Sequence, residues 1–144
     1  MKKINLTDKI DASKEILFDY LAKKGVKKVE VSFDGGGDDG QINSIAIDGK
    51  YESKITSDKL VGVYVVDCRR FDSKTNTFVP VFREASDLED VLTSLCYEAL
   101  ETVAPGWENN EGAEGFFDFD VKKRKLTLSF GERITEVNYI KYAL

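Results

Sequence analysis

SDLEDVLTSLCYEALETVAPG, residues 86–106, is the stretch that decides the fold class, because it predicts the clearest helix in the chain. Ser86 and Glu89 match a capping box at its start, and Pro105-Gly106 predicts its end. The apolar residues recur at helical spacing and predict one buried stripe, made of Leu88, Val91, Leu92, Leu95, Ala99, Leu100 and Val103. A helix with a single apolar stripe packs against another layer, and the flanking segments predict that this layer is a β-sheet.

The N-terminal part of the chain predicts a second helix followed by strands. The helix is expected over Asp11–Lys24, with Gly25 just after its end. KKVEVSF (27–33) alternates apolar and polar residues, which is the pattern of a half-buried strand. QINSIAI (41–47) predicts a second strand of the same kind.

Further strands are expected before residue 86. Asp48-Gly49 predicts a two-residue hairpin turn. LVGVYVVDC (60–68) is the most continuous apolar run and predicts a central strand. After a turn at 72–76, TFVPVF (77–82) predicts an edge strand, because proline has no N–H for a ladder. Beyond the hairpin turn, alternating residues predict one more strand, through Tyr51, Ser53 and Ile55.

The C-terminal part predicts a last hairpin. GFFDFDV (115–121) and KLTLSF (125–130) alternate on either side of a basic turn at 122–124. Residues 136–144 predict a final strand or a short helix. The basic cluster 122–125 is expected to be a solvated turn rather than a nucleic-acid site. The element order predicts an α+β fold, an antiparallel β-sheet of about five to seven strands with two helices packed mainly on one face.

The composition is that of one globular domain, 1–144. Apolar residues make up 42% of the chain and aromatic residues 11%, which is typical of folded proteins. No apolar run reaches the roughly 18 residues of a membrane span. The polar start MKKINLTDKIDASKE lacks the apolar core of a signal peptide, so a cytoplasmic location is expected.

Histidine is absent, which limits the chemistry that the chain could perform. Serine–histidine and cysteine–histidine nucleophiles, histidine zinc sites and imidazole proton shuttles are excluded. Catalysis would depend on carboxylates, lysine, tyrosine or a bound cation. Cys68 and Cys96 are too far apart in sequence for a metal or redox motif, and we expect two buried free thiols.

Charge is unevenly distributed along the chain. The formal net charge is −5, but residues 84–121 contain 11 acidic residues and no Lys or Arg. The remainder, which holds all 21 basic residues, is therefore net basic. Such segregation creates a field that can steer a charged partner, although it does not determine a fold.

The glycine-rich loop at residues 34–40, DGGGDDG, is the first candidate site. Clustered carboxylates and backbone carbonyls are ligands for hard cations, so Asp34, Asp38 and Asp39 are candidate ligands of a Ca²⁺ or Mg²⁺ site, although Gly and Asp more often serve turn geometry alone. The spacing lacks the calcium-loop pattern and its closing glutamate. A plain hairpin loop and a partner contact remain alternative interpretations.

The loop at residues 105–115, PGWENNEGAEG, is the second candidate site. It holds the only tryptophan of the chain. One interpretation is a structural lid, in which the indole covers the core. The other is an apolar platform with a polar rim for a cationic ligand or a basic partner surface. The residues of this candidate binding site are Trp107, Glu108, Asn109, Asn110, Glu111 and Glu114.

SFDGGGDDGQI and GWENNEGAEGFFDFD together resemble a family of small bacterial and phage proteins of unknown function. The first motif matches at Gly37, Asp38, Gly40 and Gln41, and the second at Gly106, Trp107, Glu108, Asn109, Asn110, Gly112 and Gly115. Pro105 stands where another glycine is expected, and Asp39 where a serine is usual. The resemblance implies a shared site and no named activity.

The function that the sequence favours is a non-catalytic interaction or regulatory module, which uses the 105–115 and 34–40 loops to bind a protein with a basic surface. Segregated acidity, the missing histidines and the lack of a complete catalytic set support this hypothesis. One alternative is a carboxylate- or metal-dependent enzyme with a site between the two loops. Another is an acidic nucleic-acid mimic; direct binding of nucleic acid is not expected.

Overall fold

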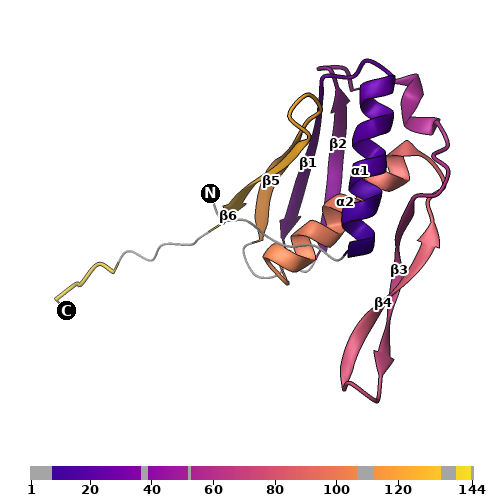
Figure 1. Ribbon diagram of the computed structural model, residues 1–144. Helices are drawn as coiled ribbons and strands as arrows, with labels where there is room; N and C mark the ends of the chain where they lie inside the picture. Colours follow the sequence, from indigo (N-terminus) through magenta and orange to yellow (C-terminus); the bar gives the residue numbers. More distant parts are fainter. Residues whose placement is uncertain (1–7, 37–38, 52, 107–111, 134–138, 144) are drawn as a thin grey trace.

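The computed structural model describes residues 8–36, 39–51, 53–106, 112–133 and 139–143 (Figure 1). The predicted α+β class is confirmed. Within these described residues, six strands form two antiparallel sheets, of four and two strands, rather than one sheet. The elements are α1 (Asp8–Lys23), β1 (Lys28–Gly36), β2 (Asp39–Ile47), the 3₁₀ helix η1 (Lys54–Ser57), β3 (Tyr64–Asp72), β4 (Thr77–Glu84), α2 (Leu88–Val103), β5 (Ala113–Asp120) and β6 (Lys125–Glu132).

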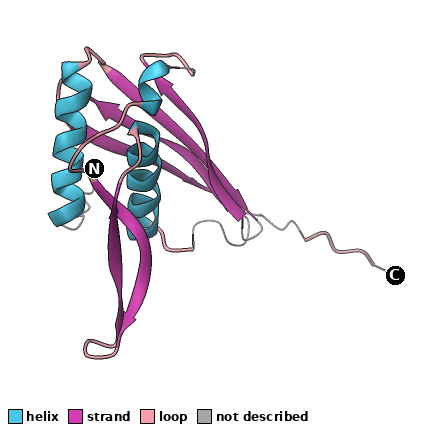
Figure 2. Cartoon of the chain, turned by 90° about the vertical axis from the view of Figure 1, so that its right-hand side faces the viewer, coloured by secondary structure: helices cyan, strands magenta, loops and turns pink. Residues whose placement is uncertain are grey.

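The four-stranded sheet has the order β2-β1-β5-β6, and one of its faces carries the core. Val29, Val31 and Phe33 of β1 alternate on that face and are buried, as their spacing predicts. Phe18 of α1 packs against Phe119 of β5, with ring centroids 6.2 Å apart. Both helices lie on this one side of the sheet, as predicted (Figure 2).

The hairpin turn at Asp48-Gly49 is confirmed, since both residues have positive φ angles of 50° and 81°. The strand predicted beyond it, over residues 51–55, is wrong. Only Lys50 continues the hairpin, as an isolated bridge to Ile47, and η1 follows. The hydroxyl of Thr56 donates to the carbonyl of Ser53 at 2.8 Å, a local bond that favours a tight turn over a ladder.

The strand predicted at 60–68 is confirmed only from Tyr64 onward, and its central position is wrong. A turn with Gly62 at φ 76° precedes β3, and among the described strands β3 pairs only with β4. Leu60 and Val63 are buried without belonging to a strand, which explains the apolar run. The edge position predicted for 77–82 is confirmed, with Pro80 opposite Arg69 in the two-stranded ribbon.

The start of α2 lies one residue later than the predicted capping box. Asp87, not Ser86, is the N-cap, and its side chain accepts a 2.8 Å hydrogen bond from the Asp90 amide. Both Ser86 Oγ and its amide donate to Asp90 instead. The predicted stripe of α2 is buried except at Val103, which is 39% exposed near the end of the helix.

Only one of the two thiols is buried. Cys96 lies on the core side of α2, and burial raises the pKa of its thiol well above the usual value. Cys68 is exposed, because β3 belongs to the ribbon and not to a central strand. The prediction of two buried thiols is therefore wrong for Cys68.

The C-terminal hairpin of β5 and β6 is confirmed, with its turn at 121–124. Residues 139–143 form neither a strand nor a helix, and residues 134–138 and 144 lie outside the described residues. Among the residues that the structure describes, no helix has the length and hydropathy needed to cross a bilayer.

Leu92→Ala should lower the free energy of unfolding by about 2–5 kcal/mol, because it leaves a cavity beneath α2. Leu92 is fully buried in the core. Val61→Ala, at an exposed position, is the control and should change stability by less than about 0.5 kcal/mol. Chemical denaturation measures both, and equal shifts would contradict the placement of the stripe.

Asp90→Asn should destabilise the fold by about 1–3 kcal/mol near neutral pH, because Asp90 accepts charged hydrogen bonds from Arg83 at 2.6 and 2.8 Å. These bonds, mainly, hold the pKa of Asp90 well below its usual range. The carboxylate therefore stabilises the fold above its unfolded pKa near ~3.9, and this contribution is lost as the pH falls through the folded value.

Unfolding free energies measured from pH 7 to pH 3 should show a difference between wild type and Asp90→Asn that shrinks below about pH 4. Glu89→Gln, which removes an exposed charge from the same helical turn, is the matched control. A difference between Asp90→Asn and wild type that stays constant down to pH 3 would rule out the ionic contribution.

Candidate functional site

The two predicted loops join the sheet at the same end. β1 and β5 are antiparallel neighbours, and their register places Asp34 opposite Glu114 and Gly35 opposite Ala113. Gly36 pairs with Asp39 at the start of β2. β1 and β2 thus extend into the predicted 34–40 loop and leave two residues between them. These residues, 37 and 38, lie outside the described part of the chain. Both motifs therefore adjoin the same end of the four-stranded sheet.

Arg133 connects the ends of these strands. Its guanidinium donates to Asp34 Oδ1 at 2.7 Å, to Glu114 Oε2 at 3.3 Å and to the Gly35 carbonyl at 3.0 Å. Its amide donates to the Gly112 carbonyl at 3.0 Å. One residue just beyond β6 thereby binds the end of β1 and the start of β5.

The contact with Arg133 explains how two carboxylates can face each other. Like charges directly opposite on neighbouring strands are destabilising. A guanidinium placed between Asp34 and Glu114 offsets their repulsion, and hydrogen bonding to Asp34 is the main cause that raises the pKa of Arg133. All three side chains are partly or largely exposed to solvent, so salt should weaken this interaction.

A second pair of acids lies farther along the same two strands. Glu30 stands opposite Asp118 in the register of β1 and β5. The ammonium of Lys28 lies 3.6 Å from Glu30 and 3.2 Å from Asp118. Hydrogen bonding to Asp118 is the main cause that raises the pKa of Lys28. Two cross-strand acid pairs therefore each share one cation.

These side chains occupy the face of the sheet that points away from the helices. Alternation places them opposite to the buried Val29, Val31 and Phe33. No described element lies against this face (Figure 2). Phe116 lies between the two acid pairs, opposite Ser32, and is 38% exposed. We call this surface the acidic face, formed by Glu30, Ser32, Asp34, Glu114, Phe116, Asp118 and Asp120.

The predicted site residues are only partly described. Asp34 and Glu114 lie at the end of the acidic face. Within the described residues, no group of three or more Asp, Glu or Cys side chains is placed to hold a metal ion. The cation and tryptophan-platform hypotheses stay predictions, because most of their residues lie outside the described part of the chain. These are Trp107, Glu108, Asn109, Asn110, Glu111, Asp38 and the side chain of Asp39.

Sequence reasoning missed Arg133, Lys28 and Phe116. The four-residue turn at 121–124 places Arg133 opposite Gly112, whereas the predicted three-residue turn at 122–124 would place it opposite Ala113, so the register had to be known to one residue. Phe116 is harder to distinguish, since it directly precedes Phe117 and only their alternation assigns one to the core.

A family model described as a family of unknown function (DUF6878) matches residues 10–144. The chain belongs to this family. The resemblance drawn from the two motifs is confirmed to that extent, whereas the motifs as its mark and a bacterial or phage source stay predictions. No curated protein and no solved structure gives a match to the chain.

Two glycines in the matched region have direct structural reasons. Gly112 has a φ of 81°, a conformation that L side chains rarely adopt, where the chain enters β5. A Cβ at Gly115 would lie 2.0 Å from the carbonyl oxygen of Ser129, so no larger residue fits between β5 and β6. Both glycines allow the backbone conformation and the close strand packing at the start of β5, where the second motif joins the sheet.

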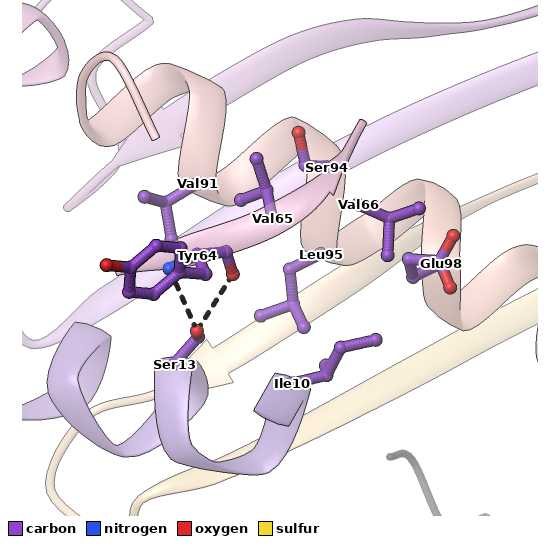
Figure 3. A pocket seen from close by; sticks show the side chains of 9 residues that line it. All are labelled: Ile10, Ser13, Tyr64, Val65, Val66, Val91, Ser94, Leu95 and Glu98. Atoms are coloured by element: carbon purple, nitrogen blue, oxygen red, sulfur yellow. Dashed lines mark hydrogen bonds between the residues drawn. The ribbon is translucent and has the colours of Figure 1, made fainter. Parts of the chain in front are cut away.

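A separate hollow lies between α1, α2 and β3, where the ribbon of β3 and β4 meets the two helices (Figure 3). The Ser13 hydroxyl donates to the Tyr64 carbonyl at 2.9 Å and accepts from the Tyr64 amide at 3.3 Å. Nearby, Glu98 accepts a 2.6 Å hydrogen bond from Arg69. Ser13 thus satisfies the backbone of Tyr64, and the Arg69–Glu98 contact joins β3 to α2, so these polar contacts connect the ribbon to the two helices.

Arg133→Gln should loosen the end of the sheet where the motifs join it. Without the guanidinium, Asp34 and Glu114 repel each other across the strands. Hydrogen exchange followed by NMR should become faster at the amides of Gly35, Ala113 and Glu132, while amides near Lys28, at the opposite end of β1, keep their rates.

Neutralising the acids supplies the control. Arg133→Gln should have a smaller effect on exchange in a background that carries Asp34→Asn and Glu114→Gln, because no repulsion is left to offset. Equal acceleration in both backgrounds would show that Arg133 acts through its carbonyl contacts alone.

Proposed function

We propose that the chain is a non-catalytic interaction module, which binds the basic surface of another protein through the acidic face. The observation that carries this proposal is that both motifs adjoin one end of that face, through the paired ends of β1 and β5. Residues 105–115 and 34–40 would then extend the same binding surface. A cytoplasmic setting remains part of the proposal.

Charge supports a basic partner. Each acid pair has two carboxylates and one cation, so each keeps an excess negative charge. Asp120 adds a further carboxylate on the same face, between Lys28 and Lys125 in the register of the neighbouring strands. A surface with a net charge raises the rate at which an oppositely charged partner associates, and salt screens the effect over about 10 Å at 0.1 M.

The position of Phe116 supports a specific contact rather than only long-range attraction. Interfaces commonly place an aromatic anchor at their centre and polar groups at the rim. Phe116 is exposed between the two acid pairs, which gives the acidic face this arrangement. A basic side chain of the partner could lie over the ring and near a carboxylate at the same time.

The alternatives explain the acidic face less well. Acid–base catalysis uses two carboxylates in different environments. Asp34 and Glu114 instead share one guanidinium on an open surface. A nucleic-acid mimic would reproduce an uninterrupted line of phosphate charges. Here Lys28, Phe116 and Arg133 interrupt the acids.

A short peptide rich in Arg and Lys, titrated into the ¹⁵N-labelled protein, should shift amide resonances mainly along β1 and β5. The fluorescence of Trp107, the only tryptophan, gives a second readout, from within the 105–115 stretch of the sequence. Glu114→Gln with Asp118→Asn should weaken binding about three- to tenfold at low salt, since exposed ion pairs contribute about 0.2–1 kcal/mol each.

Glu15→Gln with Asp19→Asn is the matched control. These acids of α1 also share one cation, Arg124, and lie on the helical side of the sheet. The control should leave peptide affinity nearly unchanged. Equal weakening by both double variants, or shifts spread evenly over all acidic surfaces, would refute a dedicated acidic face.

A further inference from the structure

The ribbon of β3 and β4 projects from the body as an arm (Figures 1 and 2). Among the described residues, the polar contacts at its base include Ser13 with the backbone of Tyr64, Glu98 with Arg69, and Asp90 with Arg83. We call residues 69–80 the β-arm. This segment runs from Arg69 to the turn at the end of the ribbon and returns to Pro80, which lies opposite Arg69.

The β-arm exposes apolar side chains at its far end. Phe71 and Phe78 face each other across the strands, with ring centroids 5.4 Å apart, and are 50% and 68% exposed. An isolated two-stranded ribbon is only marginally stable in water. Exposed aromatic residues on such an element mark a surface that gains stability when a partner covers it.

The β-arm is also basic. It carries Arg69, Arg70 and Lys74 but only one acid, Asp72. Arg70 and Lys74 are exposed and belong to no ion pair among the residues that the structure describes. The β-arm therefore combines aromatic and basic groups, whereas the acidic face combines exposed Phe116 with carboxylates.

The β-arm cannot serve the acidic face of its own chain. The ribbon is anchored among the helices, on the covered side of the four-stranded sheet, while the acidic face lies on the other side (Figure 2). A second copy of the chain supplies an acidic face of complementary charge, against which no described element of that copy lies.

We infer that the β-arm of one copy docks on the acidic face of a second copy, so that the protein recognises itself through these two surfaces. The inference rests on the proposed function and names its partner. Arg70 and Lys74 would approach the acid pairs of the second copy, and Phe71 and Phe78 would pack near Phe116. Complementary charge sets which surfaces meet, and apolar contact adds stability.

Sedimentation of the purified chain over a range of concentrations should show concentration-dependent self-association that weakens at high salt. Two double variants reverse the charges of one surface each: Arg70→Glu with Lys74→Glu on the β-arm, and Glu30→Lys with Glu114→Lys on the acidic face. Each variant alone should self-associate at least about tenfold more weakly, because like charges then meet at the contact.

The decisive sample is an equal mixture of the two double variants. In the mixture, the acidic β-arm of one variant meets the basic face of the other, and the remaining native surfaces also match. Association should return to within about threefold of wild type. Circular dichroism melts check that each variant folds, and Lys27→Glu with Lys50→Glu, which reverses exposed charges elsewhere, should leave association unchanged.

Self-association that survives both reversals, or a mixture that stays monomeric, would overturn the inference, as would a wild-type chain that sediments as a monomer throughout. The Arg- and Lys-rich peptide separates this failure from a failure of the proposed function. Peptide binding by a monomeric chain would reject the second copy as the partner and keep the acidic face as a binding surface. Loss of both would reject both proposals.

Discussion

The alternation of side chains along β1 is the constraint on which the rest of the structure depends. Val29, Val31 and Phe33 must be covered, and α1 and α2 supply the cover on one side of the sheet. The same alternation sends Glu30, Ser32 and Asp34 to the opposite side. The strand that organises the core therefore also places an acidic surface where no described element lies against it. Burial and surface charge are two consequences of one pattern.

Antiparallel pairing then creates an electrostatic problem that distant residues solve. β5 places Glu114 and Asp118 directly opposite the acids of β1. Lys28, at the start of β1, and Arg133, after β6, each lie between two carboxylates. Because these cations come from opposite ends of the sheet, both ends are tied to the strands that carry the acids. The cost of opposed charges is offset, and a modest negative excess is left for solvent or a partner.

Local patterns predicted much of the fold and less of the site. The α2 stripe, the β1 alternation and the Asp48-Gly49 turn were correct, because neighbouring residues decide each of them. The apolar run at 60–68 misled, since Leu60 and Val63 are buried through tertiary contacts rather than in a strand. The N-cap is Asp87 rather than the predicted Ser86, because Ser86 donates a hydrogen bond to Asp90, whereas Asp87 accepts from the Asp90 amide. Asp34 and Glu114 were identified, but their contact through Arg133 depends on the register of three strands.

Charge segregation along the sequence has a different meaning once the chain is folded. Residues 84–121 contain no Lys or Arg, yet four of their acids have cationic partners from outside that segment. Asp90 pairs with Arg83, Glu98 with Arg69, Asp118 with Lys28, and Glu114 with Arg133. The acids of this segment therefore bind the ribbon, the start of β1 and the end of β6 to α2 and β5. The exposed pairs, Asp118–Lys28 and Glu114–Arg133, contribute little stability each, whereas Asp90 and Glu98 are largely buried. Opposite signs on separate segments also restrict which segments can meet. The concentration of acids in the 84–121 segment, which suggested a binding surface, therefore serves in part to form ion pairs within the folded chain. The recognition that we propose would use the excess negative charge left on the acidic face.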